Sequence, residues 1–221
     1  IKNTAEAKSA KTESNDLREL AMKDPLTGLG NRNFFDMRLQ HALDRAVRQS
    51  EQICLLFLDL DGFKAVNDTY GHVAGDGVLR EIAGRLMAAA RKPDTVARLG
   101  GDEFAVVMET GATRAGAQTL CERITGAVVQ PIAVDGQSVE LGVSIGTAMF
   151  PDDCADAETL LRLADDHMYA VKNLARAGAA TVQGLRRSGW GDGPAAARAI
   201  TKRRSSSSAR DNRESRSAPI G

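Results

Sequence analysis

The fold of this chain is decided by Arg98-Leu99-Gly100-Gly101-Asp102-Glu103-Phe104, a stretch in which a pair of glycines joins two apolar runs. The runs cover 95–99 and 104–108, and they read as the two arms of a hairpin. Consecutive glycines favour a tight turn because both accept positive φ at little steric cost. We therefore expect a β-hairpin whose tip presents Asp102 and Glu103 to solvent.

A second acidic pair, Asp59 and Asp61, closes an apolar run at 53–60. The run is apolar on both faces, which predicts a central strand. An EF-hand needs a carboxylate at loop position twelve, where Tyr70 stands, and a phosphatase with a nucleophilic aspartate needs a small residue where Phe63 stands. A metal-binding strand end and a solvated acidic turn both remain open for this stretch alone. Strand ends that carry carboxylates suit a Mg²⁺–nucleotide site, because Mg²⁺ takes few protein oxygens and completes its shell with phosphate and water.

The rest of the chain alternates between helical and extended patterns. Asp135-Gly136 predicts a two-residue turn between two strands, and Thr113 is a candidate N-cap. This order predicts an α+β fold with one central, mostly antiparallel sheet flanked by helices. The sequence shows no internal repeat. Helical patterns cover 4–23, 32–49, 62–69, 73–90, 113–129 and 155–175, and extended patterns cover 53–60, 95–99, 104–108, 132–134 and 139–149.

Composition indicates one globular domain in a chain of 221 residues that is 43% hydrophobic. The sequence shows no membrane-spanning run and no signal peptide, and its start at Ile1 suggests a fragment of a longer protein. Cys54, Cys121 and Cys154 are far apart and lack metal-ligand spacing, so we expect reduced thiols rather than a disulfide framework or a zinc site. We expect a cytoplasmic domain, whose full-length protein could be tethered to a membrane.

The net charge of zero hides an asymmetry between the two parts of the chain. From 184 to 221 there are nine Lys and Arg against three Asp and Glu, a net charge of +6, so the remainder carries −6. We expect 181–221 to be a disordered basic tail, because it has too little apolar surface to offset its ordering entropy. Such a tail could contact nucleic acid or an acidic membrane, although no specific nucleic-acid partner is expected. We expect 1–23 to be a helical stalk or linker.

Three motifs, in the same order, resemble those of the GGDEF family, the diguanylate cyclases. Residues 24–32 read DPLTGLGNR, residues 57–68 read FLDLDGFKAVND, and residues 98–104 carry the family signature. Gly71-His72 and Gly75-Asp76 follow the second motif as they do in the family. The resemblance covers the domain that we expect at 24–180.

This resemblance implies a fold related to class III nucleotidyl cyclases and polymerase palm domains. It also implies a reaction, in which two GTP condense to cyclic di-GMP and release two pyrophosphates. A homodimer would bring two GTP-loaded domains face to face, with Mg²⁺ or Mn²⁺ as cofactor. An upstream sensor domain would control the relative position of the two domains.

The resemblance also assigns roles to the acidic residues. Asp59 and Asp102 would hold the metal by their carboxylates, and Leu60 would add its backbone carbonyl. Glu103 would be a further ligand or would help to activate the ribose 3′-OH; which of Asp102 and Glu103 acts as the base stays open. Two divalent ions could hold the attacking and leaving oxygens.

Further residues that match the family would bind the substrate. Asn67 and Asp76 would meet guanine, and a carboxylate that accepts from guanine N1–H and N2–H₂ favours GTP over ATP. Ala175 and Ala177 stand where the family often has glycine and asparagine, which lets the last helix run further. The groups expected near the phosphates are Lys64, Gly100, Gly101, Lys172 and Arg176.

Arg91-Lys92-Pro93-Asp94 is an RxxD pattern that, taken alone, also fits a polar turn between a helix and a strand. In the family this spacing marks a product-inhibition site, where Arg91 and Asp94 would bind cyclic di-GMP and Arg123 would add a second arginine. Two alternatives to an active cyclase remain. One is a catalytically silent receptor for GTP or cyclic di-GMP, and the other is an interaction scaffold that uses its basic tail.

Overall fold

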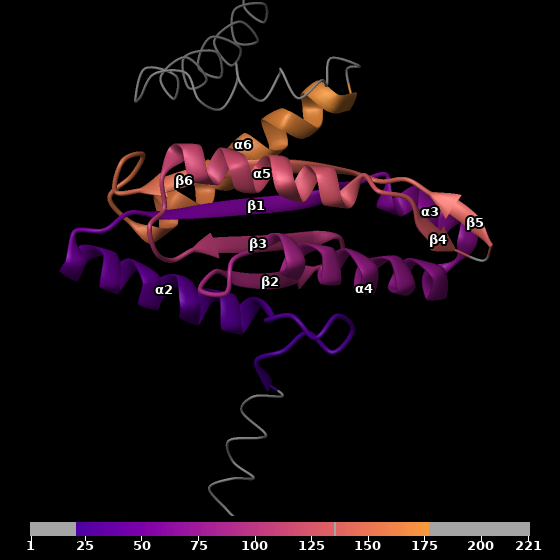
Figure 1. The fold of residues 1–221 in the computed structure, drawn as a ribbon, viewed down its shortest axis with the longest axis horizontal. Helices are drawn as coiled ribbons and strands as arrows, with labels where there is room; N and C mark the ends of the chain where they lie inside the picture. Colours follow the sequence, from indigo (N-terminus) through magenta and orange to yellow (C-terminus); the bar gives the residue numbers. More distant parts are fainter. Residues whose placement is uncertain (1–20, 135, 177–221) are drawn as a thin grey trace, which may run out of the picture.

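A sheet of four antiparallel strands forms the centre of the domain, in the order β2-β3-β1-β6 (Figure 1). Strand β1 lies between β3 and β6, and this central position explains why its sequence is apolar on both faces. The predicted α+β fold and the predicted antiparallel sheet are confirmed. The strands are β1 (Ile53–Asp61), β2 (Thr95–Gly100), β3 (Glu103–Met108) and β6 (Gly142–Phe150).

This computed structural model describes residues 21–134 and 136–176. The predicted stalk, apart from its last three residues, and the predicted tail lie outside the described residues.

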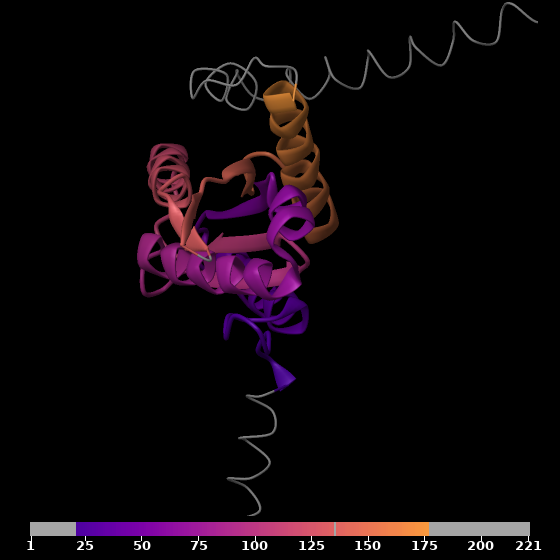
Figure 2. The same cartoon turned by 90° about the vertical axis from the view of Figure 1, so that its right-hand side faces the viewer.

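Two helices cover each face of the sheet, so that the domain has three layers (Figure 2). Alternate residues of β1 belong to different cores. Leu56 and Leu58 pack with α4 and α5, whereas Ile53 and Leu55 pack with α2 and α6. The four helices are α2 (Arg32–Gln49), α4 (His72–Ala89), α5 (Arg114–Val128) and α6 (Ala157–Arg176).

The predicted helix ends follow local capping chemistry. The side chain of Asn31 accepts a hydrogen bond from the Phe34 N–H at 3.0 Å, and α2 begins at the predicted residue. Thr113 caps α5 in the same way, because its hydroxyl accepts from the Gly116 N–H at 3.0 Å. Both caps satisfy N–H groups that a helix leaves without a partner in its first turn.

The predicted strand over 139–149 is wrong, because the structure divides it into two elements. Among the described residues, strand β5 (Gln137–Val139) pairs with β4 (Ile132–Val134) alone, as a separate hairpin. Strand β6 begins at Gly142 and pairs with β1 along its whole length. Figure 1 places the small hairpin beside α3 (Phe63–Tyr70), the short helix that follows β1.

Candidate active site

The turn that carries the signature acids lies one residue later than the glycine pair alone predicts. Gly100 pairs with Glu103, and the β2–β3 register shifts between Arg98 and Gly100. The two glycines have φ angles of +150° and +51°, as expected for their permissive backbones. Asp102 therefore lies in the turn and is half-buried, while Glu103 is the exposed first residue of β3.

Strand pairing brings the two acidic segments together. Asp59 of β1 lies directly opposite Glu103 of β3 in the antiparallel register. The Leu60 N–H donates to the Asp102 carbonyl oxygen at 3.2 Å, which fixes the turn against the end of β1. Asp59 is only 7% exposed, so its carboxylate needs a nearby positive charge or a hydrogen-bond donor.

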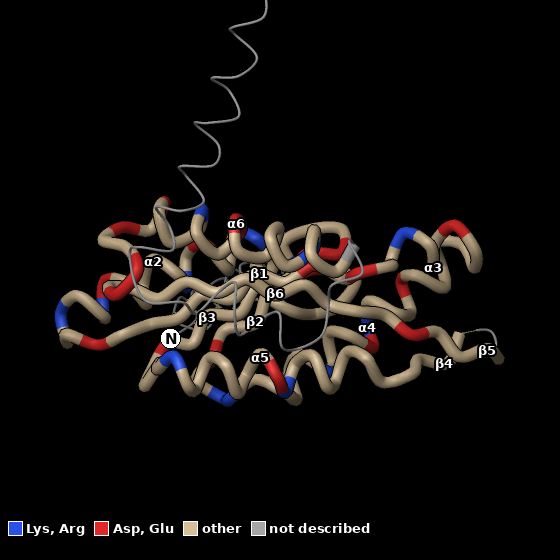
Figure 3. Tube along the Cα trace, turned by 90° about the horizontal axis from the view of Figure 1, so that it is seen from above, with Lys and Arg blue, Asp and Glu red and all other residues tan. Residues whose placement is uncertain are grey.

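Lys172 of α6 supplies that positive charge. Its ammonium donates a hydrogen bond to Asp59 Oδ1 and forms an ion pair with it. Lys172 continues the stripe of Leu160, Ala164 and Met168 on α6, three residues that are buried against the sheet. Along the chain trace seen in Figure 3, acidic and basic residues are interspersed.

Arg98 is a residue of the site that the sequence reasoning missed. Its Nη1 donates to the two Asp24 carboxylate oxygens at 3.1 and 3.2 Å, while its Nε and Nη2 donate to the Gly101 carbonyl at 3.0 and 2.8 Å. The guanidinium thus links the N-terminal turn to the turn that carries Asp102. Asp24 and Arg98 both lie in the motifs quoted above. Their opposite charges were the signal in the sequence from which this ion pair could have been predicted.

The Asp24 carboxylate is held in its ionised form. Burial raises its pKa, but the hydrogen bonds from the Thr27 backbone N–H and hydroxyl and from Arg98 outweigh burial, and the net pKa lies below its ordinary value. The two Thr27 bonds measure 2.8 and 2.6 Å. Hydrogen bonds to the ionised Asp24 carboxylate therefore stabilise the N-terminal turn.

Two further contacts define the roles of neighbouring charged groups. The Ser144 hydroxyl lies 2.9 Å from both carboxylate oxygens of Asp61, so Asp61 faces β6. Arg32, at the start of α2, lies 3.9 Å from Glu103, and both side chains are at least half exposed. The long distance and the exposure make this second pair a weak one.

The residues expected to bind guanine lie on two successive helices. Asn67 is on α3 and Asp76 is on α4, and both are half-buried. A Cβ at position 75 would collide with the Asn67 side-chain oxygen, so Gly75 lets that amide lie against the start of α4. Among the residues expected near phosphate, Lys64 is exposed on α3 and Arg176 is the last residue of α6.

These donors fit a hard divalent ion that completes its shell elsewhere. Among residues 21–134 and 136–176, no three His, Cys, Asp or Glu side chains gather into a complete metal site. Mg²⁺ commonly uses one or two carboxylates together with substrate phosphates and water. Asp59 already holds a cationic group, and Glu103 lies opposite it across the strands. The pair therefore suits a metal that arrives with a nucleotide.

The three residues expected to bind the product line one small hollow between the loop that follows α4, the end of β3 and α5. The Arg91 N–H donates to Asp94 Oδ2 at 2.9 Å, and Arg123 donates to the Ala89 carbonyl. The other Asp94 oxygen is buried and finds no hydrogen-bond partner in the part of the chain that the structure describes. Burial raises the pKa of Asp94, against the lowering effect of the Arg91 N–H and of the charges of Arg91 and Arg123. A ligand N–H would satisfy this oxygen.

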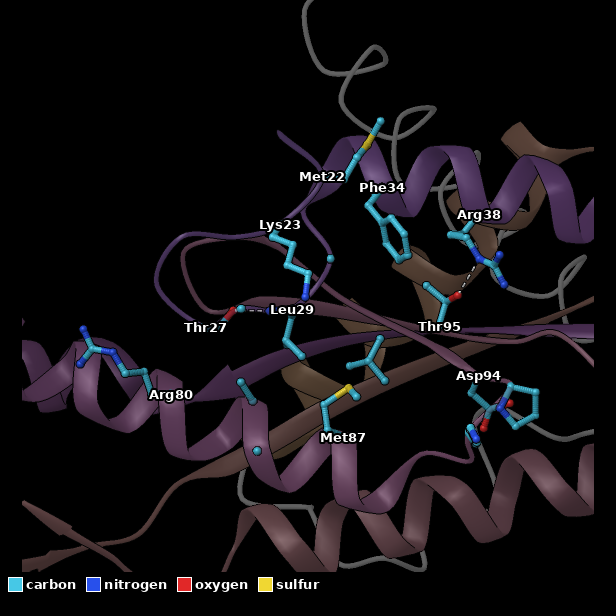
Figure 4. Close-up of a pocket in the computed structure, with 17 residues that line it drawn as sticks. Met22, Lys23, Thr27, Leu29, Phe34, Arg38, Arg80, Met87, Asp94 and Thr95 are labelled. Atoms are coloured by element: carbon cyan, nitrogen blue, oxygen red, sulfur yellow. Dashed lines mark hydrogen bonds between the residues drawn. The ribbon is translucent and has the colours of Figure 1, made fainter. Parts of the chain in front are cut away.

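A larger cavity of about 720 Å³ lies away from the carboxylate pair (Figure 4). Figure 4 shows Lys23 and Leu29 of the N-terminal segment on one side and Met87 of α4 on another. Asp94 borders this cavity as well as the small hollow, but Asp59, Asp102 and Glu103 do not line it. The larger cavity is therefore not the candidate active site.

Comparison with known proteins shows the family to which the domain is similar. The family described as "Diguanylate cyclase, GGDEF domain" matches residues 21–177. MucR of Pseudomonas aeruginosa, a bifunctional diguanylate cyclase/cyclic di-GMP phosphodiesterase, is 44% identical over 163 residues, which are 74% of this chain and 24% of MucR. The diguanylate cyclase TpbB of P. aeruginosa is 43% identical over 165 residues, 74% of this chain and 38% of TpbB. The crystal structure of the coiled coil and GGDEF domain of DgcB from Caulobacter crescentus, in complex with c-di-GMP, superposes with a TM-score of 0.72 at 31% identity, covering 78% of this chain and 91% of that one.

The four-stranded antiparallel sheet with its flanking helices is the palm-type fold of nucleotidyl cyclase domains. The chain belongs to the diguanylate cyclase GGDEF domain family. It spans only 24% of MucR and 38% of TpbB. Within the described residues, none of the helices combines the length and the apolar character that a membrane crossing requires.

Proposed function

We propose that this domain condenses two GTP molecules into cyclic di-GMP and releases two pyrophosphates. The observation that carries the proposal is the pairing of β1 with β3, which places Asp59 opposite Glu103 and ties Leu60 to Asp102. Relatives named diguanylate cyclase, at 43% identity, support the same reaction class.

Asp59, Asp102, Glu103 and the Leu60 carbonyl would hold the divalent metal, Mg²⁺ or Mn²⁺. When bound, the metal would lower the charge on the triphosphate and polarise the α-phosphate toward attack by a ribose 3′-OH. Glu103 is exposed at the open side of the pair, so it can approach a hydroxyl that arrives from outside the domain. Asp102 is half-buried and held through its backbone by Leu60, which favours a fixed ligand role.

Substrate recognition would use groups on both sides of the metal site. Lys64, Lys172 and Arg176 would neutralise phosphate oxygens, and Gly100 and Gly101 would let the backbone approach them closely. Asn67 and Asp76 would bind the guanine edge. In this scheme Asp76→Ser reduces the preference for GTP over ATP, which competitive binding of the two nucleotides measures; an unchanged preference would remove Asp76 from base recognition.

Each domain would bind one GTP, so the reaction needs two domains that face one another. A homodimer is therefore part of the proposal, with an upstream sensor domain to control its geometry. Cyclic di-GMP would inhibit the enzyme at Arg91, Asp94 and Arg123, where the buried, unpartnered Asp94 oxygen is suited to accept from guanine N–H groups. The complex of DgcB with c-di-GMP supports a guanine dinucleotide as the ligand class.

The test is incubation of the 221-residue chain with GTP and Mg²⁺, followed by chromatographic separation of nucleotides. We expect cyclic di-GMP from the wild type and from Asp36→Ala, an exposed acid on α2, but none from Asp102→Ala. Product formation by Asp102→Ala at the wild-type rate would refute the assigned site. A chain that binds cyclic di-GMP but never forms it would be a receptor instead.

A further inference from the structure

The Asp59–Lys172 pair joins two residues to which the proposed function gives different partners. The two positions are 113 residues apart in sequence, and their side chains are only 10% and 19% exposed. A pair this well shielded from water interacts more strongly than a surface pair, because the local dielectric constant is lower. Asp59 is expected to bind the metal and Lys172 is expected to bind phosphate. The ion pair between them must therefore change when both ligands bind.

The packing of α6 against β6 fixes the backbone position from which the Lys172 side chain extends. A Cβ at Gly146 of β6 would collide with the Ala164 carbonyl and the Met168 N–H, so helix and strand are in backbone contact there. His167 Nδ1 lies 2.7 Å from the Thr147 carbonyl oxygen on the same strand. Lys172 follows Met168 by one helical turn, so the backbone of α6 delivers its side chain to the Asp59 end of β1.

We propose that Lys172 is a counter-ion shared between Asp59 and the nucleotide, and that it couples metal binding to nucleotide binding. Without metal, Lys172 neutralises the buried Asp59 carboxylate. When Asp59 turns to a divalent ion, Lys172 is released to the triphosphate that arrives with it. This inference rests on the proposed function, because it takes its metal and its nucleotide from there.

The sharing has two consequences of opposite sign. For a metal alone, Lys172 is a competitor for Asp59, so it weakens metal binding. For a metal together with a nucleotide, Lys172 gains a new partner, so it strengthens binding of both. Because such coupling is reciprocal, the nucleotide increases the affinity for metal by the same factor as the metal increases the affinity for nucleotide.

The test measures Mn²⁺ binding to the 221-residue chain by the electron paramagnetic resonance signal of free Mn²⁺, without nucleotide. We expect Lys172→Met to bind Mn²⁺ about ten-fold more tightly than the wild type, as loss of one close positive charge predicts. Lys172→Arg keeps the charge and should stay near the wild type. Lys64→Met is the matched control, because Lys64 is also assigned to phosphate but is exposed, whereas the ion pair of Asp59 is with Lys172. It should leave the affinity for Mn²⁺ alone within about two-fold.

The second measurement repeats the titration with guanosine-5′-[(α,β)-methyleno]triphosphate. The gain in Mn²⁺ affinity that this analogue produces should be at least about ten-fold smaller in Lys172→Met than in the wild type. The shared counter-ion would be overturned if Lys172→Met bound Mn²⁺ alone no more tightly than the wild type does. It would also be overturned if Lys64→Met bound Mn²⁺ alone as tightly as Lys172→Met. Either result would leave the proposed function standing. Failure of the wild type to bind Mn²⁺ even with the analogue would overturn both.

Discussion

Asp24→Asn is the substitution that tests most directly how the N-terminal turn supports the candidate site. Asparagine keeps the shape of the side chain and can still accept from Thr27, but it removes the charge that faces Arg98. The Arg98 guanidinium also holds the Gly101 carbonyl through two hydrogen bonds of 3.0 and 2.8 Å. Loss of the charge therefore loosens a side chain that joins the two turns.

The size of the effect follows from burial. The pair is 16% and 12% exposed, which places it between a surface ion pair and a fully buried one. Hydrogen bonds to a charged group contribute about 1.5–3 kcal/mol, so we expect a loss of about 2 kcal/mol in the free energy of unfolding. For a domain of this size that loss lowers Tm by roughly 6 °C. Turnover of GTP should fall by about ten-fold, because the turn that carries Asp102 shifts relative to β1.

The stability loss should depend on pH in one direction. The folded-state pKa of Asp24 lies below its ordinary value, so its contribution to stability is present above about pH 4 and is lost as the pH falls through the folded-state pKa. The difference in urea unfolding between wild type and Asp24→Asn should therefore be largest at pH 7 and should shrink progressively as the pH falls below about 4. A difference that stays constant over this range would show that the charge of Asp24 does not stabilise the fold.

A matched control and a double-mutant cycle complete the test. Asp36→Asn removes an exposed acidic charge on α2 and should change the unfolding free energy by less than about 0.5 kcal/mol. Asp24→Asn and Arg98→Met should be non-additive by about 1–2 kcal/mol, because each removes the partner of the other. Additive losses would refute the direct link between Asp24 and Arg98.

Three further predictions concern other parts of the domain. Gly146→Ala should lower the unfolding free energy by about 3 kcal/mol in urea, because the new Cβ meets the backbone of α6, whereas Gly126→Ala has open space and should not destabilise; equal stability of the two variants would contradict this packing. Asp94→Asn should weaken cyclic di-GMP binding by about ten-fold in calorimetry. An unchanged affinity would show that Asp94 does not contact the ligand. Burial raises the pKa of Cys154 to about 11 and of Cys121 to about 12, so both thiols should react slowly with Ellman's reagent at pH 8 until the protein unfolds. Fast reaction of either thiol in the native protein would contradict its burial.

Local sequence patterns predicted most of the secondary structure and the position of the acidic segments. The central position of β1 could be predicted because a strand buried on both faces must be apolar throughout, and the caps at Asn31 and Thr113 depend on residues within three positions. The same patterns failed where a strand was divided. Residues 139–149 are apolar enough for one strand, but pairing with two different partners ends β5 at Val139 and begins β6 at Gly142.

The sequence by itself determined which residue types the candidate site uses, because the motifs contain its acids, its glycines and the guanidinium of Arg98. Only the tertiary structure decided which of them meet. Asp24 and Arg98 are 74 positions apart, and Asp59 and Lys172 are 113 apart. Such contacts depend on strand register and on the distance at which a helix packs against the sheet, and both are set by the summed packing of the whole domain rather than by neighbouring residues.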